Sequence, residues 1–262
     1  MSQKIYQIDA FADALFSGNP AAVCPLDNWL DADIMQKIAA ENNLAETAFT
    51  VPVENGYEIR WFTPEVEVDL CGHATLASAY TLMNFEGFSG EKINFFSRNS
   101  GTLTVNKNGD FLTLDFPKDN LKKVEDLAIF EKCFVYQPIE AYQGKTDYLL
   151  VFENEHQIQN IEPNIPEIAK INARGIIVSS ISENFDFVSR FFGPNCGVNE
   201  DPVTGSAHTT LTPFWAEKLG KTKLTAKQIS KRGGVLECEL KNDRVLISGK
   251  CKTYLKGEIF IK

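Results

Sequence analysis

Alternation of apolar and polar residues along the chain predicts many short strands. Residues 4–11 alternate well enough for a first strand, and residues 57–62 form another that Thr63-Pro64 closes. Asn108-Gly109 is a strong two-residue hairpin signal that leads into a strand at 111–116. Further strands are expected at 21–25, 46–51, 92–97, 102–106, 133–136, 139–143, 147–152, 175–179, 185–192, 235–241, 245–248 and 254–261. Because hairpins dominate and repeated βαβ units are absent, the pattern predicts an α+β fold.

Helical patterns are few and separated by strands. Helices are expected at 31–43, 73–85, 166–170 and 227–231, and from the Gly205 loop to about Leu219. Asp31 can cap the first of them. The second is a run of small apolar residues, which indicates a helix packed tightly against other elements. Pro213 lies inside the last long helix, so its first turn is expected to be separate or kinked.

An internal echo links the two halves of the chain. Segment 60–64 (RWFTP) reappears as segment 190–194 (RFFGP), and at the same offset Ile38-Ala39 matches Ile168-Ala169. Self-similarity at a fixed offset indicates a repeated structural unit. We therefore predict two pseudo-symmetric lobes, each a barrel-like, mostly antiparallel sheet around a central helix. The expected boundaries are 1–118 for the N-terminal lobe, with 252–262 returning to it, and 119–251 for the C-terminal lobe.

Each half also contains a glycine loop that opens a helix. Gly72-His73 precedes one run of small apolar residues, and Gly205-Ser206 precedes another. A helix start carries unpaired N–H groups and the positive end of the helix dipole, so it suits a carboxylate or phosphate. Two such starts predict a cleft between the lobes in which a small anion is bound.

Composition restricts the class of partner. The chain has 262 residues and a formal net charge of −9, which argues against nucleic-acid binding because that needs a basic face. No stretch approaches the ~18 apolar residues of a membrane span, and no export signal is recognised, so a cytoplasmic location is expected. The six cysteines are scattered without a C-x-x-C pair, and free, mostly buried thiols are expected.

Four residues are candidates for chemistry, and each has a structural alternative. Glu46 is either a rim carboxylate or a desolvated general acid/base, and His73 is either a core histidine or a neutral group facing a substrate. Asp201 either caps the loop before the second long helix or acts on a substrate. Ser206 either caps that helix or binds an anion, since both uses share one geometry.

Several other chemistries lack their sequence signals. The three histidines are far apart and show no metal-ligand spacing, so no metal is expected. No phosphate-binding loop, dinucleotide fingerprint or G-x-S-x-G elbow occurs, and no flavin or pyridoxal signature is visible. What remains is cofactor-free proton chemistry on a small anion.

Five motifs, in order, resemble the PhzF-like family of phenazine-biosynthesis proteins along the whole chain. They are 8–11 (IDAF) with 18–23 (GNPAAV), 43–49 (NLAETAF), 60–64 (RWFTP), 71–76 (CGHATL) and 200–207 (EDPVTGSA). The resemblance implies the diaminopimelate epimerase-like fold, a homodimer and no cofactor.

The same resemblance implies roles for individual residues. Glu46 would be the acid/base, with His73 and Asp201 beside it and with Gly72, Gly205 and Ser206 binding the substrate. Relatives of this fold that racemise amino acids use two cysteines, and Cys71 looks like one of them. Its expected partner position is occupied by Pro202-Val203, which disfavours a two-cysteine mechanism.

The resulting hypothesis is a cofactor-independent isomerase of a small carboxylated metabolite, in which a glutamate in the cleft between the lobes moves a proton between carbons. Two alternatives stay open. One is a racemase or epimerase that uses Cys71 with a non-cysteine partner. The other is a non-catalytic protein that binds small anions.

Overall fold

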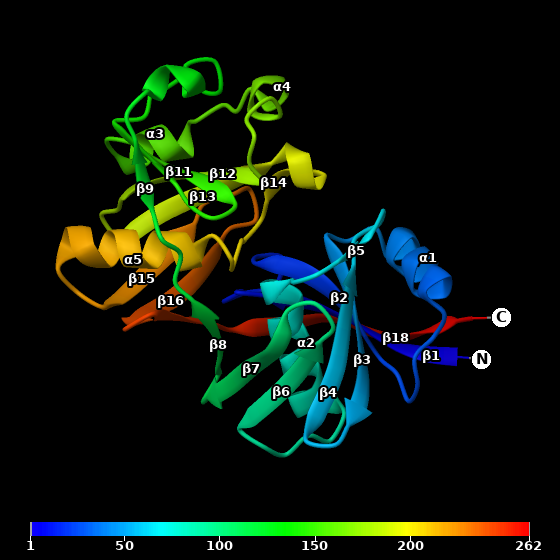
Figure 1. The fold of residues 1–262 in the computed structure, drawn as a ribbon. Helices are drawn as coiled ribbons and strands as arrows, with labels where there is room; N and C mark the ends of the chain where they lie inside the picture. Colours follow the sequence, from blue (N-terminus) through cyan, green and yellow to red (C-terminus); the bar gives the residue numbers. More distant parts are fainter. Residues whose placement is uncertain (1, 262) are drawn as a thin grey trace. The chain divides into compact units, whose positions relative to one another are not determined.

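The computed structural model describes residues 2–261, in which strands far outnumber helices, so the expected α+β class is confirmed (Figure 1). The chain divides into two compact units, Met1–Asp115 with Ser248–Lys262, and Phe116–Ile247. No helix in the described part is both long and apolar enough to cross a membrane.

The first unit is a sheet with one buried helix. Its elements are β1 (Ser2–Ala10), β2 (Asn19–Pro25), α1 (Ala32–Asn42), β3 (Glu46–Val53), β4 (Gly56–Phe62), β5 (Glu67–Val68), α2 (Gly72–Phe85), β6 (Lys92–Ser97), β7 (Gly101–Asn108), β8 (Phe111–Pro117, which ends just past the boundary) and β18 (Cys251–Phe260). Antiparallel pairs join β18 to β1 and β1 to β2, and β2 then runs parallel to β3. Next, β3 and β4 are antiparallel, β4 and β6 parallel, and β6 and β7 antiparallel. Helix α2 contacts β1, β2 and β18 and also β7, so strands from both ends of this order lie against it (Figure 1).

Small and hydroxylated residues allow α2 to be buried on nearly every side. Ala74, Ala77 and Ala79 are fully buried, which is typical of a helix inside a core rather than on its surface. The buried hydroxyls of Thr75 and Ser78 donate to the carbonyl four residues earlier, at 2.6 and 2.7 Å, and Thr81 does the same. These bonds satisfy polar groups that would otherwise be costly in an apolar core.

The second unit has the same kinds of elements. They are β9 (Lys122–Val124), η1 (Leu127–Phe130), β10 (Glu140–Gln143), β11 (Asp147–Val151), α3 (Glu155–Gln159), α4 (Ile165–Ile168), β12 (Gly175–Ile181), β13 (Phe187–Gly193), η2 (Pro194–Cys196), β14 (Val198–Asp201), α5 (His208–Leu219), β15 (Lys223–Gln228), β16 (Gly234–Lys241) and β17 (Arg244–Gly249). Here β11 and β12 are parallel, β12 and β13 antiparallel, β13 and β15 parallel, and β15 and β16 antiparallel. This is the order of pairings found from β2 to β7 in the first unit.

The echoed arginines occupy the same kind of position in the two units. Arg60 on β4 binds both carboxylate oxygens of Glu67 at 2.6 Å and lies over the ring of Phe62. Arg190 on β13 binds Glu200 at 2.6 and 3.0 Å and lies over Phe192. The sequence repeat therefore corresponds to a repeated structural feature. In each unit an arginine on a long strand makes two hydrogen bonds to a glutamate on the short strand that follows.

Two expected elements are wrong. Residues 133–136 form a turn with one isolated bridge, Phe134 to Pro163, because Cys133 and Phe134 pack into a core cluster rather than into a sheet. The segment 227–231 is not a helix, since its first residues belong to β15. That strand pairs with both β13 and β16, and these two partners override the local helical preference.

The expected break before α5 is confirmed. The turn ahead of the helix uses short-range bonds, from His208 N to Gly205 O at 3.0 Å and from Thr209 N to Ser206 O at 3.1 Å. Pro213 cannot donate to the carbonyl of Thr209, and the N–H of Asp119 donates to that carbonyl instead, at 3.1 Å. The helix therefore continues through the proline without an orphaned carbonyl.

Candidate active site

Glu46 is the first residue of β3, at the place where the sequence predicts a strand to begin. The left-handed backbone of Asn43 ends α1 and turns the chain into this strand. β3 lies between β2 and β4, so its start is held on both sides. The Glu46 side chain is 19% exposed, which leaves a carboxylate that is largely shielded from water but still accessible.

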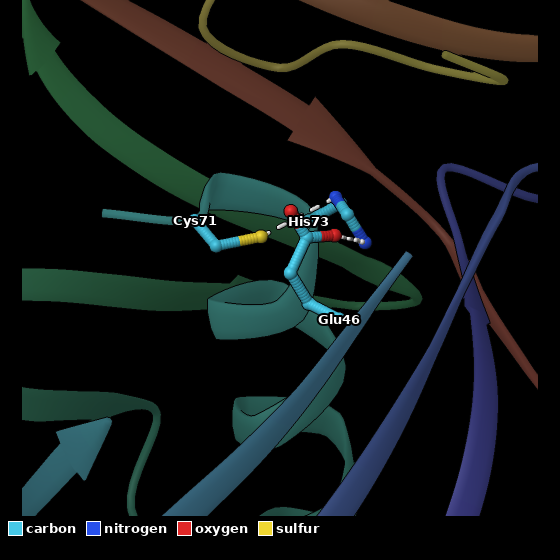
Figure 2. Close-up of side chains that lie close together, drawn as sticks. All are labelled: Glu46, Cys71 and His73. Atoms are coloured by element: carbon cyan, nitrogen blue, oxygen red, sulfur yellow. Dashed lines mark hydrogen bonds and ion pairs between the residues drawn. The ribbon is translucent and has the colours of Figure 1, made fainter. Parts of the chain in front are cut away.

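His73, in the first turn of α2, lies against this carboxylate. Its Nε2 is 3.2 Å from Glu46 Oε2 and its Nδ1 is 3.5 Å from Cys71 Sγ (Figure 2). The same Nδ1 is 3.3 Å from the amide nitrogen of Asn19. The Asn19 amide nitrogen is a donor, so Nδ1 is the accepting nitrogen and the ring proton lies on Nε2. His73 Nε2 therefore faces Glu46 Oε2 at 3.2 Å, in a contact that is not a well-directed hydrogen bond.

Burial keeps this imidazole neutral. The His73 side chain is 7% exposed, and burial lowers its pKa to about 3, although the carboxylate beside it acts in the opposite direction. The positive end of α2 also disfavours an imidazolium at this position. Near neutral pH the pair is thus a carboxylate and a neutral donor rather than two opposite charges.

Cys71 and the start of α2 complete the group. Cys71 is the N-cap residue with extended backbone, but it makes no side-chain capping bond, and the first turn holds no acidic residue. The helix start is therefore not neutralised by a carboxylate of its own first turn, which suits an anionic ligand near Gly72. None of the six cysteines forms a disulfide, and all but Cys196 are buried, as expected of mostly buried thiols.

The same three side chains could hold a metal ion. One ligand atom from each of Glu46, Cys71 and His73 lies within 4.8 Å of the others. Oxygen, sulfur and nitrogen donors together suit zinc, with a water or a substrate as a fourth ligand. Sequence spacing gave no sign of this grouping, because β3 and the α2 loop bring the donors together from separate segments.

Asp201 is the last residue of β14, at the start of the loop that leads to α5 in the second unit. Its carboxylate accepts from Thr204 Oγ1 at 2.5 Å, and its backbone carbonyl accepts from Gln228 Nε2 at 2.7 Å. The Thr204 N–H donates to Gln228 Oε1 at 2.9 Å. Asp201 therefore has the loop-bracing role that the sequence allowed, and Gln228 is a supporting residue that sequence reasoning missed.

Gly205 and Ser206 lie in the turn that follows, and His208 is the first residue of α5. The N-cap residue of α5 is Ala207, so Ser206 is not the cap, and its hydroxyl accepts from Arg174 at 3.0 Å. His208 is fully buried and its Nδ1 donates to the carbonyl of Thr204 at 2.9 Å. Burial lowers the pKa of His208 to about 4.

A cavity in the first unit lies away from the Glu46 group. Its volume is about 440 Å³, and its lining includes Lys4, Tyr57, Leu82 and Glu86. Leu82 and Glu86 mark the C-terminal end of α2, whereas Gly72 and His73 mark its start. None of the site residues predicted from the sequence lines this cavity.

Comparison with known proteins places the chain among closely similar sequences. The family described as phenazine biosynthesis-like protein matches residues 8–257. An uncharacterized isomerase of Pseudomonas aeruginosa is 50% identical over the full length of both chains. The crystal structure of a phenazine biosynthesis protein of the PhzF family from Enterococcus faecalis is 45% identical, covers both chains fully and has a TM-score of 0.97. A hydroxyproline epimerase from Agrobacterium vitis shares the fold, with a TM-score of 0.62, 9% identity and coverage of 98% and 92%.

Proposed function

Because the chain belongs to the phenazine biosynthesis-like family and is an isomerase, we propose that it moves a proton between two carbons of a small carboxylated metabolite. Glu46 is the acid/base in this proposal. It removes the proton from one carbon and returns it to another, so no external oxidant or reductant is needed. No cofactor is assigned to the reaction.

The observation that carries the proposal is the pairing of Glu46 with a neutral histidine. An imidazolium 3.2 Å away would stabilise the carboxylate and weaken it as a base. A neutral His73 places no cation beside Glu46 and leaves the carboxylate able to accept a proton. Asn19 supports this state because its amide donates to the other ring nitrogen.

Five further residues have roles in the proposal. Gly72 at the start of α2 binds a carboxylate of the substrate through free N–H groups, and His73 orients Glu46. The proposal also assigns roles to three residues of the second unit: Asp201 as a catalytic residue, and Gly205 and Ser206 as substrate-binding residues. The repeated order of strand pairings supports the two pseudo-symmetric lobes that the sequence predicts, each closed around its own helix.

One observation favours a second candidate, an epimerase. Cys71 Sγ is 3.5 Å from His73 Nδ1, which could take the thiol proton and leave a thiolate at a helix start. Such a thiolate would remove a proton from one face of a carbon, and a non-cysteine partner would return a proton to the opposite face. The fold does not choose between the two reactions, since a hydroxyproline epimerase shares it.

The experiment that tests the proposal is Glu46→Gln, assayed by proton NMR for deuterium uptake from D₂O into a panel of small unsaturated carboxylates. Turnover should fall by roughly 10²–10⁴-fold, the usual worth of a positioned general acid/base, while unfolding by urea is little changed. The matched control is Glu54→Gln, an exposed glutamate just after the same strand. Its turnover should equal that of the parent protein.

The outcomes separate the candidate functions. Deuterium at a new carbon together with a change in ultraviolet absorbance indicates double-bond isomerisation, whereas deuterium at an inverted centre alone indicates epimerisation. Carboxylate binding without any exchange indicates a binding protein. Full turnover by a well-folded Glu46→Gln protein would contradict the assignment of the acid/base.

A further inference from the structure

Arg174 lies directly beside the Gly205-Ser206 loop. It immediately precedes β12, and its N–H donates to the carbonyl of Thr146 at 2.8 Å, which fixes the backbone. The guanidinium donates from Nη2 to Ser206 Oγ at 3.0 Å and from Nε to Asp147 Oδ1 at 2.9 Å, with a second Nη2 bond to Asp147 Oδ2. A single side chain thus ties a buried carboxylate at the start of β11 to the loop.

The position of the guanidinium is closely fixed. Asp147 is 3% exposed, and the fork of two hydrogen bonds to it allows one orientation of the planar group. The guanidinium lies 5.2 Å from the centre of the Phe191 ring. A Cβ on Gly175 would come within 2.3 Å of that ring, so the glycine is what lets Phe191 lie close to the start of β12.

The hydrogen bond from Arg174 determines whether the Ser206 hydroxyl acts as a donor or an acceptor toward a ligand. A serine hydroxyl has one proton and two acceptor lone pairs, and an arginine can only donate. Because one lone pair of Ser206 receives the arginine N–H, the hydroxyl proton is left to point away from the cation, toward any ligand at the loop. We infer that Arg174 is a positioning residue that makes Ser206 a hydrogen-bond donor for the carboxylate of the substrate.

Charge supports the same inference. Asp147 and Asp201 both interact electrostatically with Arg174, so the loop would present two carboxylates to an anion if the arginine were absent. Only 36% of the arginine side chain is exposed. The inference rests on the proposed function, because it concerns how that site holds its carboxylate.

The test uses acetate as the probe and the whole protein. Thermal unfolding is followed during an acetate titration at constant ionic strength, and the saturable part of the stabilisation gives a dissociation constant. Arg174→Lys keeps the charge but cannot hold Asp147 and Ser206 together, and the affinity should fall roughly 10-fold, the worth of one charge-assisted hydrogen bond. Ser206→Ala should cause a similar loss.

The double variant separates positioning from other roles. If Arg174 acts through Ser206, adding Arg174→Lys to Ser206→Ala should weaken acetate binding by no more than about twofold. Fully additive losses would mean that the arginine binds the anion directly, which overturns the inference. The matched control is Arg60→Lys, which breaks the fork with Glu67 in the first unit and should cost stability without changing acetate affinity.

Two results distinguish this inference from the proposed function. Unchanged acetate affinity in Arg174→Lys, together with a loss in Ser206→Ala, overturns the inference and leaves the Glu46 proposal standing. Absence of saturable acetate binding by the parent protein overturns both. Loss of turnover in Glu46→Gln with normal acetate binding supports the proposed function without bearing on Arg174.

Discussion

The two buried histidines should make the free energy of unfolding depend steeply on pH below neutrality. Burial lowers the pKa of His73 to about 3 and that of His208 to about 4, whereas a histidine in the unfolded chain titrates near 6.5. At a pH between these values, the two histidines are protonated in the unfolded chain but neutral in the folded protein. The unfolded state is therefore favoured as the pH falls from about 6.5, and the effect ends only below the folded pKa.

The magnitude follows from the linkage relation. From pH 7.5 to pH 5.5 each buried histidine should lower the free energy of unfolding by about 1.4 kcal/mol, so the pair contributes about 2.7 kcal/mol. This is a substantial fraction of the ~5–15 kcal/mol that stabilises a typical domain. The contribution of His73 to this loss of stability is an upper bound, because the Glu46 carboxylate 3.2 Å away favours the protonated ring.

Urea unfolding at pH 7.5, 6.5 and 5.5 measures this dependence. His208→Gln should be less stable at every pH, yet its stability should fall by about 1.4 kcal/mol less than that of the parent between pH 7.5 and 5.5. The matched control is His156→Gln, which makes the same substitution at an exposed histidine. Equal pH dependence in the parent and in His208→Gln would refute the reasoning, because it would mean that His208 takes up its proton while folded.

Two other expectations concern Cys71 and Gly18. Cys71→Ala should keep most of the turnover if Glu46 carries the proton, and a loss as complete as that of Glu46→Gln would favour the epimerase. Gly18→Ala should lower the free energy of unfolding by roughly 2 kcal/mol or more in urea titrations, because φ is +72° and a Cβ would lie 2.3 Å from the Ala10 carbonyl. A stable Gly18→Ala protein would show that this turn can rearrange.

Local signals in the sequence were sufficient for the elements that bear the site. The start of β3 at Glu46 and the start of α2 at Gly72 follow from turn residues and from a run of small apolar residues, which act within a few positions. The same rules failed at 227–231, where two neighbouring strands decide the conformation. A strand pairing depends on residues tens of positions away, and a short window of sequence does not contain them.

The grouping of side chains was harder to foresee than the elements. Asn19, Glu46 and His73 come from three segments, and only the parallel pairing of β2 with β3 and the packing of α2 bring them together. Asn19 left only a weak signal, because it lies two residues before the strand expected at 21–25, in a segment typical of a turn. Arg174 left none, because a single arginine before a strand is common on protein surfaces.

The repeat relates the position of Glu46 in the first unit to that of Arg174 in the second. Phe62 pairs with Thr47 in the first unit, and its echo Phe192 pairs with Ile176 in the second. Glu46 is the residue before Thr47 and Gly175 is the residue before Ile176, so Glu46 corresponds to Gly175. Arg174 is the residue before Gly175. The first strand start thus carries a carboxylate, whereas the equivalent start in the second unit carries a glycine with a guanidinium one residue earlier, and each strand is followed later by a helix start with a buried histidine. The repeated pairings give the two units similar frames, and in our proposal the residues that differ between them divide the work, with the glutamate moving the proton and the arginine helping to hold the anion.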